Sequence, residues 1–299
     1  MPPKPPRLTA ADFDPEVLNL FNQYVHGQLD RRGFLDRAAR FAVGGSTAAG
    51  LLAALSPNFA LAQKVSPTDA RIKSEFVDFA SPAGNGKVRA LVVRPAQAAG
   101  LLPVIVVIHE NRGLNPHIED IARRLALDNF IAVAPDGLFT LGGYPGDEEK
   151  AAALFARLDR ARTSEDFIAA ANHARSLAGS NGRVGAVGFC YGGGVVNLIA
   201  TRVPELLAGA AFYGAAPALD QVGKIKAELL IVYAENDERI NAMWPPYETA
   251  LKSAGVKFEA HKYPGTQHGF NNDTTPRFDA ASAQQAWSRT LALFERTLR

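Results

Sequence analysis

Cysteine is nearly absent from this sequence: Cys190 is the only one among 299 residues. A single cysteine excludes an internal disulfide bond and any zinc site built from clustered cysteines. The six histidines are scattered, and none stands in the His-Glu-x-x-His spacing of a metalloprotease. We therefore expect no metal ion and no other cofactor.

An excess of charge of one sign is also missing, since 32 lysines and arginines face 30 aspartates and glutamates, for a net charge of +2. This balance gives no electrostatic footprint for nucleic acid. No apolar run is long enough for a stable membrane span. The composition, 47% hydrophobic and 21% charged, is that of an ordinary globular protein. We expect a small-molecule substrate, and the sequence carries no signal for an oligomeric state.

Residues 1–62 are predicted to form an N-terminal extension. Within it, residues 30–36 (Asp-Arg-Arg-Gly-Phe-Leu-Asp) resemble the twin-arginine signal with which bacteria export folded proteins. A mildly apolar stretch follows at residues 41–55, and Ala60-Leu61-Ala62 fits a small-x-small cleavage site. Two features differ from such a signal, because a long segment precedes the arginine pair and Asp36 stands where a basic residue is more usual. The pattern predicts export to the periplasm.

The alternative is a helical extension that stays on a cytoplasmic protein. Val17, Leu20, Phe21 and Tyr24 fall at helical spacing, which predicts a helix over residues 14–29. In this alternative the segment is not cleaved, and the helix stays on the mature protein.

From about residue 75 onward, short apolar runs alternate with amphipathic segments. This alternation predicts one α/β domain over residues 70–299, with a mostly parallel sheet flanked by helices. An Asn-Gly turn at residues 85–86 predicts a leading antiparallel hairpin. Two consecutive helices are expected over residues 147–162 and 164–177. The expected strands lie at residues 76–79, 88–93, 104–108, 130–134, 184–189, 208–213, 229–234 and 258–263.

Residues 188–192 read Gly-Phe-Cys-Tyr-Gly, with the single cysteine at the centre. This pattern is typical of a nucleophile elbow, a strained strand-to-helix turn that presents its central side chain. Glycines flank the centre because side chains there would collide with the adjoining strand and helix. A lone cysteine can equally be an inert buried residue. The catalytic interpretation of Cys190 therefore depends on its partners.

A cysteine nucleophile needs a base, and the base needs a third group to orient it. Asp237 and His268 each follow a predicted strand, at the end where open α/β sheets place their ligands. Their order after Cys190 matches the α/β-hydrolase order of nucleophile, acid and histidine. We interpret Asp237 as the acid and His268 as the base.

Three nearby residues compete for the same functions. Glu235 and Glu238 are rival acids because they lie within two residues of Asp237. His261 is a poorer base because it falls inside a predicted strand.

Acyl transfer also requires donors for the developing oxyanion. One is the backbone N–H of Tyr191, directly after the nucleophile. The second should come from the loop after the strand at residues 104–108, and we assign it to the N–H of Asn111.

Taken together, four segments resemble the dienelactone hydrolase (carboxymethylenebutenolidase-like) family of the α/β-hydrolase superfamily. The resemblance covers about residues 70–299. It implies an α/β-hydrolase fold that cleaves a lactone or related small ester through a Cys-His-Asp triad and a thioester acyl-enzyme. The segments are residues 109–113 (His-Glu-Asn-Arg-Gly), residues 188–193 (Gly-Phe-Cys-Tyr-Gly-Gly), Asp237, and residues 268–270 (His-Gly-Phe).

The resemblance further implies that Glu110 contacts the thiol and modulates its protonation, so that the thiol rests protonated until substrate disturbs Glu110. Glu110 could instead simply pair with Arg112 or Arg123. Titration of the thiol in a Glu110→Gln variant distinguishes these two interpretations.

The chain departs from the family after His268, where residues 269–273 lack the arginine that holds a substrate carboxylate. Arg112 and Arg277 are candidate substitutes. The candidate pocket residues are Arg112, Tyr144, Tyr191, Phe270 and Trp244, of which Trp244 is more typical of a core aromatic.

Two other functions would use the same fold. A redox-responsive protein would need Cys190 as a sensor thiol but would not need an oriented base. An acyltransferase would share the whole triad and differ only in which acceptor reaches the pocket.

Overall fold

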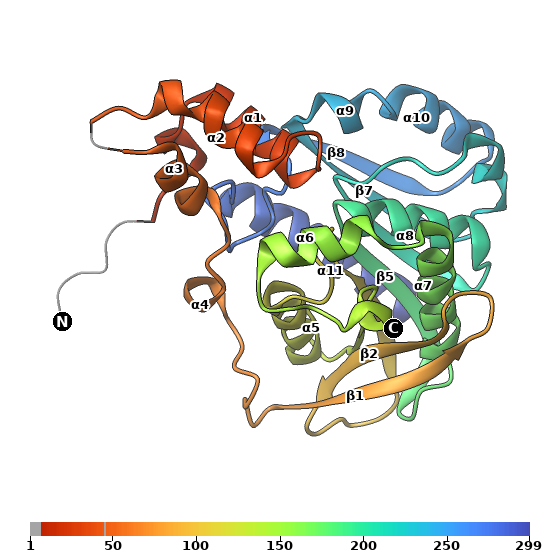
Figure 1. Cartoon of the computed structure of the whole chain (residues 1–299). Coiled ribbons are helices and arrows are strands. Elements are labelled where there is room, and N and C mark those ends of the chain that lie inside the picture. Colours follow the sequence, from red (N-terminus) through yellow and green to blue (C-terminus); the bar gives the residue numbers. More distant parts are fainter. Residues whose placement is uncertain (1–6, 45) are drawn as a thin grey trace.

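The computed structural model describes residues 7–44 and 46–299. Eight strands form one sheet in the order β1-β2-β4-β3-β5-β6-β7-β8 (Figure 1). β2 pairs antiparallel with both β1 and β4, and all other neighbouring strands are parallel. This confirms the α/β class and the leading hairpin. The strands are β1 (Ile72–Ser81), β2 (Gly86–Pro95), β3 (Leu102–Ile108), β4 (Ile131–Pro135), β5 (Ser180–Phe189), β6 (Leu206–Phe212), β7 (Glu228–Asn236) and β8 (Phe258–Gln267).

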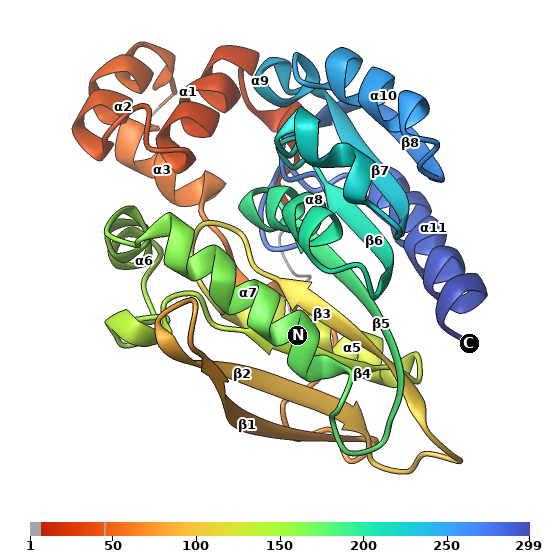
Figure 2. The same cartoon turned by 90° about the vertical axis from the view of Figure 1, so that its right-hand side faces the viewer.

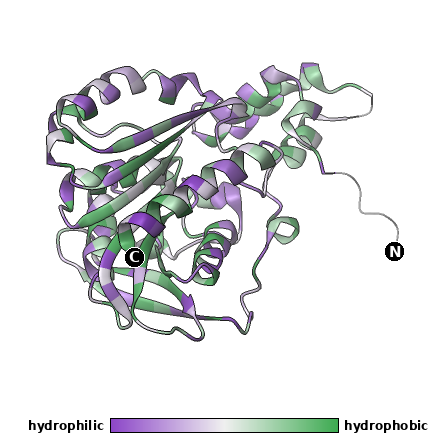
Figure 3. Cartoon of the chain, turned by 180° about the vertical axis from the view of Figure 1, so that it is seen from behind, coloured by the Kyte–Doolittle hydropathy of each residue, from purple (hydrophilic) through white to green (hydrophobic). Residues whose placement is uncertain are grey.

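Helices cover both faces of this sheet (Figure 2). One face packs against α7 (Arg160–Ala174), α8 (Tyr191–Arg202) and α10 (Trp244–Ser253). The other face packs against α5 (Pro116–Leu127) and α11 (Ala280–Leu298). Because a central strand is buried on both faces, its side chains need not alternate in polarity. Residues 104–108 of β3 are accordingly all buried, and the central strands are largely apolar in Figure 3.

The helix expected over residues 147–162 is wrong in its extent. The chain forms α6 (Glu148–Ala156) and then starts a new helix, α7, at Arg160. The break arises because the Asp159 side chain accepts the N–H groups of Ala161 and Arg162, which makes it an N-cap rather than an interior residue. This change of direction lets α7 lie along the sheet while α6 packs separately beside it.

The described N-terminal residues fold into helices α1 (Pro15–Val25), α2 (Arg31–Ala38), α3 (Ala48–Leu55) and α4 (Phe59–Ala62). The helix expected over residues 14–29 is present but ends at Val25, and Asp14 caps its start by accepting the N–H of Glu16. We call residues 7–62 the cap. Its first three helices share a small apolar core of their own: Val17, Leu18, Leu20, Phe21, Leu29, Phe34, Ala38, Leu52 and Leu55.

The cap lies beside the α/β domain (residues 70–299), at the end of the sheet where the parallel strands finish (Figures 1 and 2). The side-chain amide of Asn111 donates to the carbonyl of Val25 at 2.6 Å, and the N–H of Asn58 donates to the carbonyl of Thr274 at 2.7 Å. Among residues 7–44 and 46–299, no helix combines the length and the apolar character needed to cross a membrane.

Candidate active site

Cys190 stands at the turn between β5 and α8 with φ 55° and ψ −114°. This positive-φ conformation costs about 1–3 kcal/mol for a residue with a side chain, so the surrounding structure must hold it in place. A Cβ atom at Gly188 would lie 2.2 Å from the carbonyl oxygen of Gly192, and one at Gly192 would lie 2.3 Å from that of Ile108. The flanking glycines are therefore required by close backbone approach, and the half-buried thiol faces the cavity described below.

Asp237 and His268 form a buried pair beside the elbow. Asp237 follows β7, His268 follows β8, and Oδ2 of Asp237 lies 2.5 Å from Nδ1 of His268. Two of the three rivals are engaged elsewhere: Glu235 accepts the N–H of Gly265 at 2.7 Å, and His261 lies on β8, 3.4 Å from Glu259. The third, Glu238, is exposed in the first turn of α9 (Glu238–Asn241). Of these acids, Asp237 is the one that contacts the histidine.

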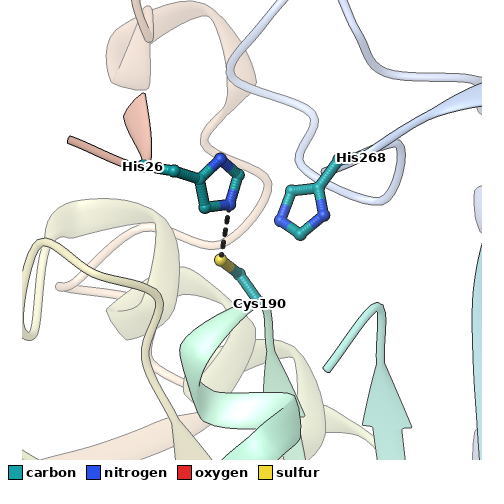
Figure 4. Close-up of side chains that lie close together, drawn as sticks. All are labelled: His26, Cys190 and His268. Atoms are coloured by element: carbon teal, nitrogen blue, oxygen red, sulfur yellow. Dashed lines mark hydrogen bonds between the residues drawn. The ribbon is translucent and has the colours of Figure 1, made fainter. Parts of the chain in front are cut away.

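Two histidines, not one, approach the sulfur. Sγ of Cys190 lies 3.6 Å from Nε2 of His26, and the rings of His26 and His268 pack edge to face with centroids 4.6 Å apart. Figure 4 shows both rings beside the sulfur. His26 follows α1 in the cap and is not among the residues predicted from the sequence. No motif surrounds it, and it lies 164 residues from the cysteine.

These contacts set the charge of the site. Burial alone would raise the pKa of the Cys190 thiol, but the charge of His268 and the hydrogen bond from His26 lower it to about 5. Burial would lower the pKa of His268, but the thiolate and Asp237 raise it to about 9. The pKa of Asp237 is lowered, because its hydrogen bond to His268 and the charge of that ring together outweigh burial. Each shift favours the charged form of its group, a thiolate and an imidazolium. The resting protonated thiol expected from the sequence stays a prediction.

Glu110 makes a different contact from the expected ones. Its Oε2 accepts the side-chain amide of Asn272 at 2.8 Å, while the hydrogen bond of the thiol goes to His26. Arg112 lies 3.8 Å from Glu148, and Arg123 pairs within α5. Among the described residues, the Glu110 carboxylate thus accepts a hydrogen bond from an amide. This bond satisfies one carboxylate oxygen but does not neutralise the negative charge of Glu110.

The expected oxyanion donors lie in the same region as the thiol. Tyr191 is the first residue of α8, so its N–H has no acceptor within the helix. Asn111 follows β3 and lines the same cavity as Cys190 and Tyr191. Its side-chain amide is committed to the carbonyl of Val25 in the cap, which leaves its backbone N–H as the candidate donor.

Two adjoining cavities, of about 450 and 420 Å³, meet at the thiol and share a wall made by the cap. The first is largely apolar, with Phe155, Tyr191 and Leu198 in its lining. The second is polar and is lined by Glu110, Arg112, Tyr144, His268 and Arg277, among others.

Arg112 and Tyr144 thus line the cavity as expected, but Phe270 does not. Phe270 is fully buried and packs against Tyr213 and Tyr263, because the turn after His268 directs its ring into the core. Trp244 packs against Tyr233 and two further aromatic rings, in agreement with its interpretation as a core residue.

Arg277, a candidate substitute for the missing arginine, lines the polar cavity. Its Nε and Nη1 atoms are buried and have no hydrogen-bond partner among residues 7–44 and 46–299. Its guanidinium lies over the ring of Phe21 in the cap, 5.1 Å from the centroid. Burial lowers its pKa, and the nearby charge of Glu110 opposes this shift.

A mostly parallel sheet, a strained Gly-x-Cys-x-Gly turn and an acid and a histidine after later strands define an α/β-hydrolase. The family model described as "Dienelactone hydrolase family" matches residues 88–298. The chain belongs to this family and is a hydrolase of the ester and lactone type. A second model, described as "YqhI-like", matches residues 4–42, in the N-terminal region.

Related proteins agree with this assignment. "Putative carboxymethylenebutenolidase" of Escherichia coli K12 is 33% identical over 234 residues, covering 72% of this chain and 84% of that protein. "Putative hydrolase fragment YghX" of the same strain is 50% identical over 113 residues, covering 38% of this chain and 97% of the fragment. A crystal structure titled as a putative dienelactone hydrolase from Klebsiella pneumoniae superposes with a TM-score of 0.66 at 28% identity, covering 75% and 99% of the two chains.

Proposed function

We propose that the protein hydrolyses small esters or lactones with Cys190 as nucleophile, His268 as proton donor and acceptor, and Asp237 as the group that orients His268. The observation that carries this proposal is the buried pair of Asp237 and His268 beside a thiol whose pKa is lowered to about 5. Only the thiolate is strongly nucleophilic, so a site that holds it at neutral pH is suited to acyl transfer.

In the first half of the reaction, Sγ of Cys190 attacks the substrate carbonyl carbon. The carbonyl oxygen becomes an oxyanion that accepts the N–H groups of Tyr191 and Asn111. As the intermediate collapses, the C–O bond of the ester breaks, and Nε2–H of His268 gives its proton to the leaving oxygen. The enzyme is left as a thioester with neutral His268, and a lactone substrate stays attached by its acyl end.

In the second half, water attacks the thioester. Nε2 of His268 takes one proton from the water as its oxygen bonds to the carbonyl carbon, and the C–S bond then breaks to restore the thiolate. The products are an acid and an alcohol, or one hydroxy acid from a lactone. Asp237 keeps the other proton on Nδ1 throughout, so that Nε2 always faces the sulfur.

The polar cavity supports an anionic substrate. Burying an arginine whose N–H donors are unpaired costs free energy, unless an anionic partner accepts hydrogen bonds from them. Arg277 lines this cavity and has two such donors within the described structure, and a substrate carboxylate that reaches them would satisfy them. It is a candidate for the carboxylate-binding arginine that the sequence lacks after His268.

Hydrolysis of p-nitrophenyl acetate tests the nucleophile. The wild-type protein should release a burst of nitrophenolate, and denatured samples taken during the burst should carry one acetyl group on Cys190 by mass spectrometry. Cys190→Ala should show neither the burst nor turnover. A wild-type protein without turnover on an ester and lactone panel, but with a reversibly oxidised Cys190, would favour the redox-responsive alternative. Turnover only with an added alcohol or amine would favour the acyltransferase.

We further propose that residues 1–62 remain on the mature protein. The cap has its own apolar core and places Val25 and His26 against the catalytic cavity, which supports retention over cleavage after Ala62. N-terminal sequencing of the protein from periplasmic and cytoplasmic fractions of its host tests this. A periplasmic chain that starts at Gln63 would contradict retention. It would support the prediction that Arg31 and Arg32 belong to a cleaved export signal.

A further inference from the structure

Three side chains from distant parts of the chain form a cluster with the composition of a metal site. One ring nitrogen each of His26 and His268, together with Sγ of Cys190, all lie within 4.8 Å of one another. They come from the end of α1, the turn before α8 and the loop after β8 (Figure 4). Two imidazoles and a thiolate suit zinc and related borderline-soft ions, not magnesium or calcium.

The two histidines are oriented as metal ligands are. Nδ1 of His26 lies 2.7 Å from the carbonyl oxygen of Asn22, and Nδ1 of His268 lies 2.5 Å from the carboxylate of Asp237. An oxygen partner at Nδ1 keeps the proton there and leaves the Nε2 lone pair free, which is the usual arrangement behind zinc-bound histidines. Nε2 of His268 is moreover buried, and no other described residue forms a hydrogen bond with it.

The spacing also fits. Tetrahedral zinc with a Zn–S distance of about 2.3 Å and a Zn–N distance of about 2.05 Å separates sulfur from nitrogen by about 3.6 Å. The observed distance from Sγ of Cys190 to Nε2 of His26 is 3.6 Å. The other two edges, within 4.8 Å, need a ring movement of about 1 Å. The fourth position would face the cavities and take a water molecule.

We propose that a zinc-class divalent cation binds Nε2 of His26, Sγ of Cys190 and Nε2 of His268, and thereby reversibly blocks hydrolysis and fastens the cap to the hydrolase domain. In the metal-free protein proposed above, one proton belongs to the pair of Sγ of Cys190 and Nε2 of His268. The metal bonds to both atoms, so that proton passes to solvent as the ion binds. The proposed nucleophile and base are then both bound to the metal and cannot react.

The charges around the cavity allow a cation to bind. The positive charge of Arg277 repels a cation, and the negative charge of the Glu110 carboxylate offsets this repulsion.

Cobalt(II) is the probe for this site, because thiolate-bound cobalt absorbs light through charge transfer from sulfur. The full-length protein, freed of metal with a chelator, should bind one Co²⁺ with this absorption, and Zn²⁺ should displace it. His26→Gln should weaken zinc binding at least about 10-fold, because one ligand is lost. Cys190→Ser should abolish the charge-transfer band. His261→Gln, a histidine on β8 outside the cluster, is the matched control and should bind as wild type.

Zinc inhibits many cysteine enzymes through the cysteine and its base alone, so His26 is the decisive residue. Zinc affinity of His26→Gln within 2-fold of wild type would overturn the proposal. X-ray absorption of the wild-type zinc complex is independent of any variant's folding: one sulfur and two imidazoles support the proposal, and one sulfur with a single imidazole contradicts it. Neither measurement requires turnover, so the hydrolytic proposal and this one can fail separately.

Discussion

The hydrolase domain and the cap are stabilised in different ways. In the domain, helices bury both faces of an eight-stranded sheet. The three principal helices of the cap have 8 to 11 residues and share one small core. Helices shorter than about 12–15 residues are marginal alone in water, so the cap depends on its contacts with the domain. The hydrolase domain thus supplies most of the stability and most of the residues of the site. The cap forms a wall of the cavities that lead to the sulfur.

The largest effect should come from removing the nucleophile in the hydrolase domain. Cys190→Ala should lower kcat/KM for ester hydrolysis by at least about 10⁴-fold, as loss of a nucleophile does in other triads. Thermal unfolding should stay within a few degrees of wild type, which is the control for folding. Activity within 10-fold of wild type would remove Cys190 from the mechanism.

A matched pair of core substitutions compares the two regions directly. Phe167 in α7 and Phe34 in α2 are both fully buried. Phe167→Ala should lower the free energy of global unfolding by about 3–5 kcal/mol, because it leaves a cavity in the main core. Phe34→Ala should instead release the cap locally, seen as faster proteolysis and hydrogen exchange confined to residues 7–62. Equal loss of global stability in both variants would show that the two regions unfold as one.

The polar cavity offers a test of substrate charge. Arg277→Ala should lower kcat/KM for a carboxylate-bearing ester by about 10- to 100-fold, since hydrogen bonds to a charged group contribute about 1.5–3 kcal/mol. A neutral ester of the same size is the control and should change by less than about 3-fold. An equal loss with both esters would mean that Arg277 supports the cavity rather than binds a carboxylate.

The smallest expected effect is on the pH dependence. kcat/KM should rise with pH through about 5, as the thiolate forms, and fall above about 9, as His268 loses the proton that the leaving group needs. His26 lowers the pKa of the thiol through its hydrogen bond. In His26→Gln the acidic limb should therefore move to higher pH by less than about one unit, while the basic limb stays. If the acidic limb is unchanged in this variant, His26 does not influence the pKa of the thiol.

The parts of the molecule governed by local sequence were predictable. A β-branched run gave the position of β3, and the elbow and the strand-exit positions of Asp237 and His268 gave three residues that the fold brings together. Each of these depends on a short pattern and on the rule that parallel strands end at one edge.

Long-range docking was not predictable. His26 meets the sulfur only because the cap packs on the domain, and no spacing in the sequence links residues 26, 190 and 268. The expectation that no metal binds depended on such spacing, and it stays untested. Likewise Asp159 could be an interior helix residue by pattern, and only the path of α7 along the sheet makes it a cap. Phe270 follows a catalytic-type histidine, yet the turn directs its ring inward.

The sulfur is enclosed by residues from both ends of the chain, His26 near the start and His268 near the end. During synthesis His26 leaves the ribosome first, and its partners follow only after most of the protein has been made. His268 emerges after Cys190, shortly before the helix α11 that covers one face of the sheet. Under the proposed mechanism, a chain interrupted between residues 190 and 268 would carry the thiol without the histidine that serves it.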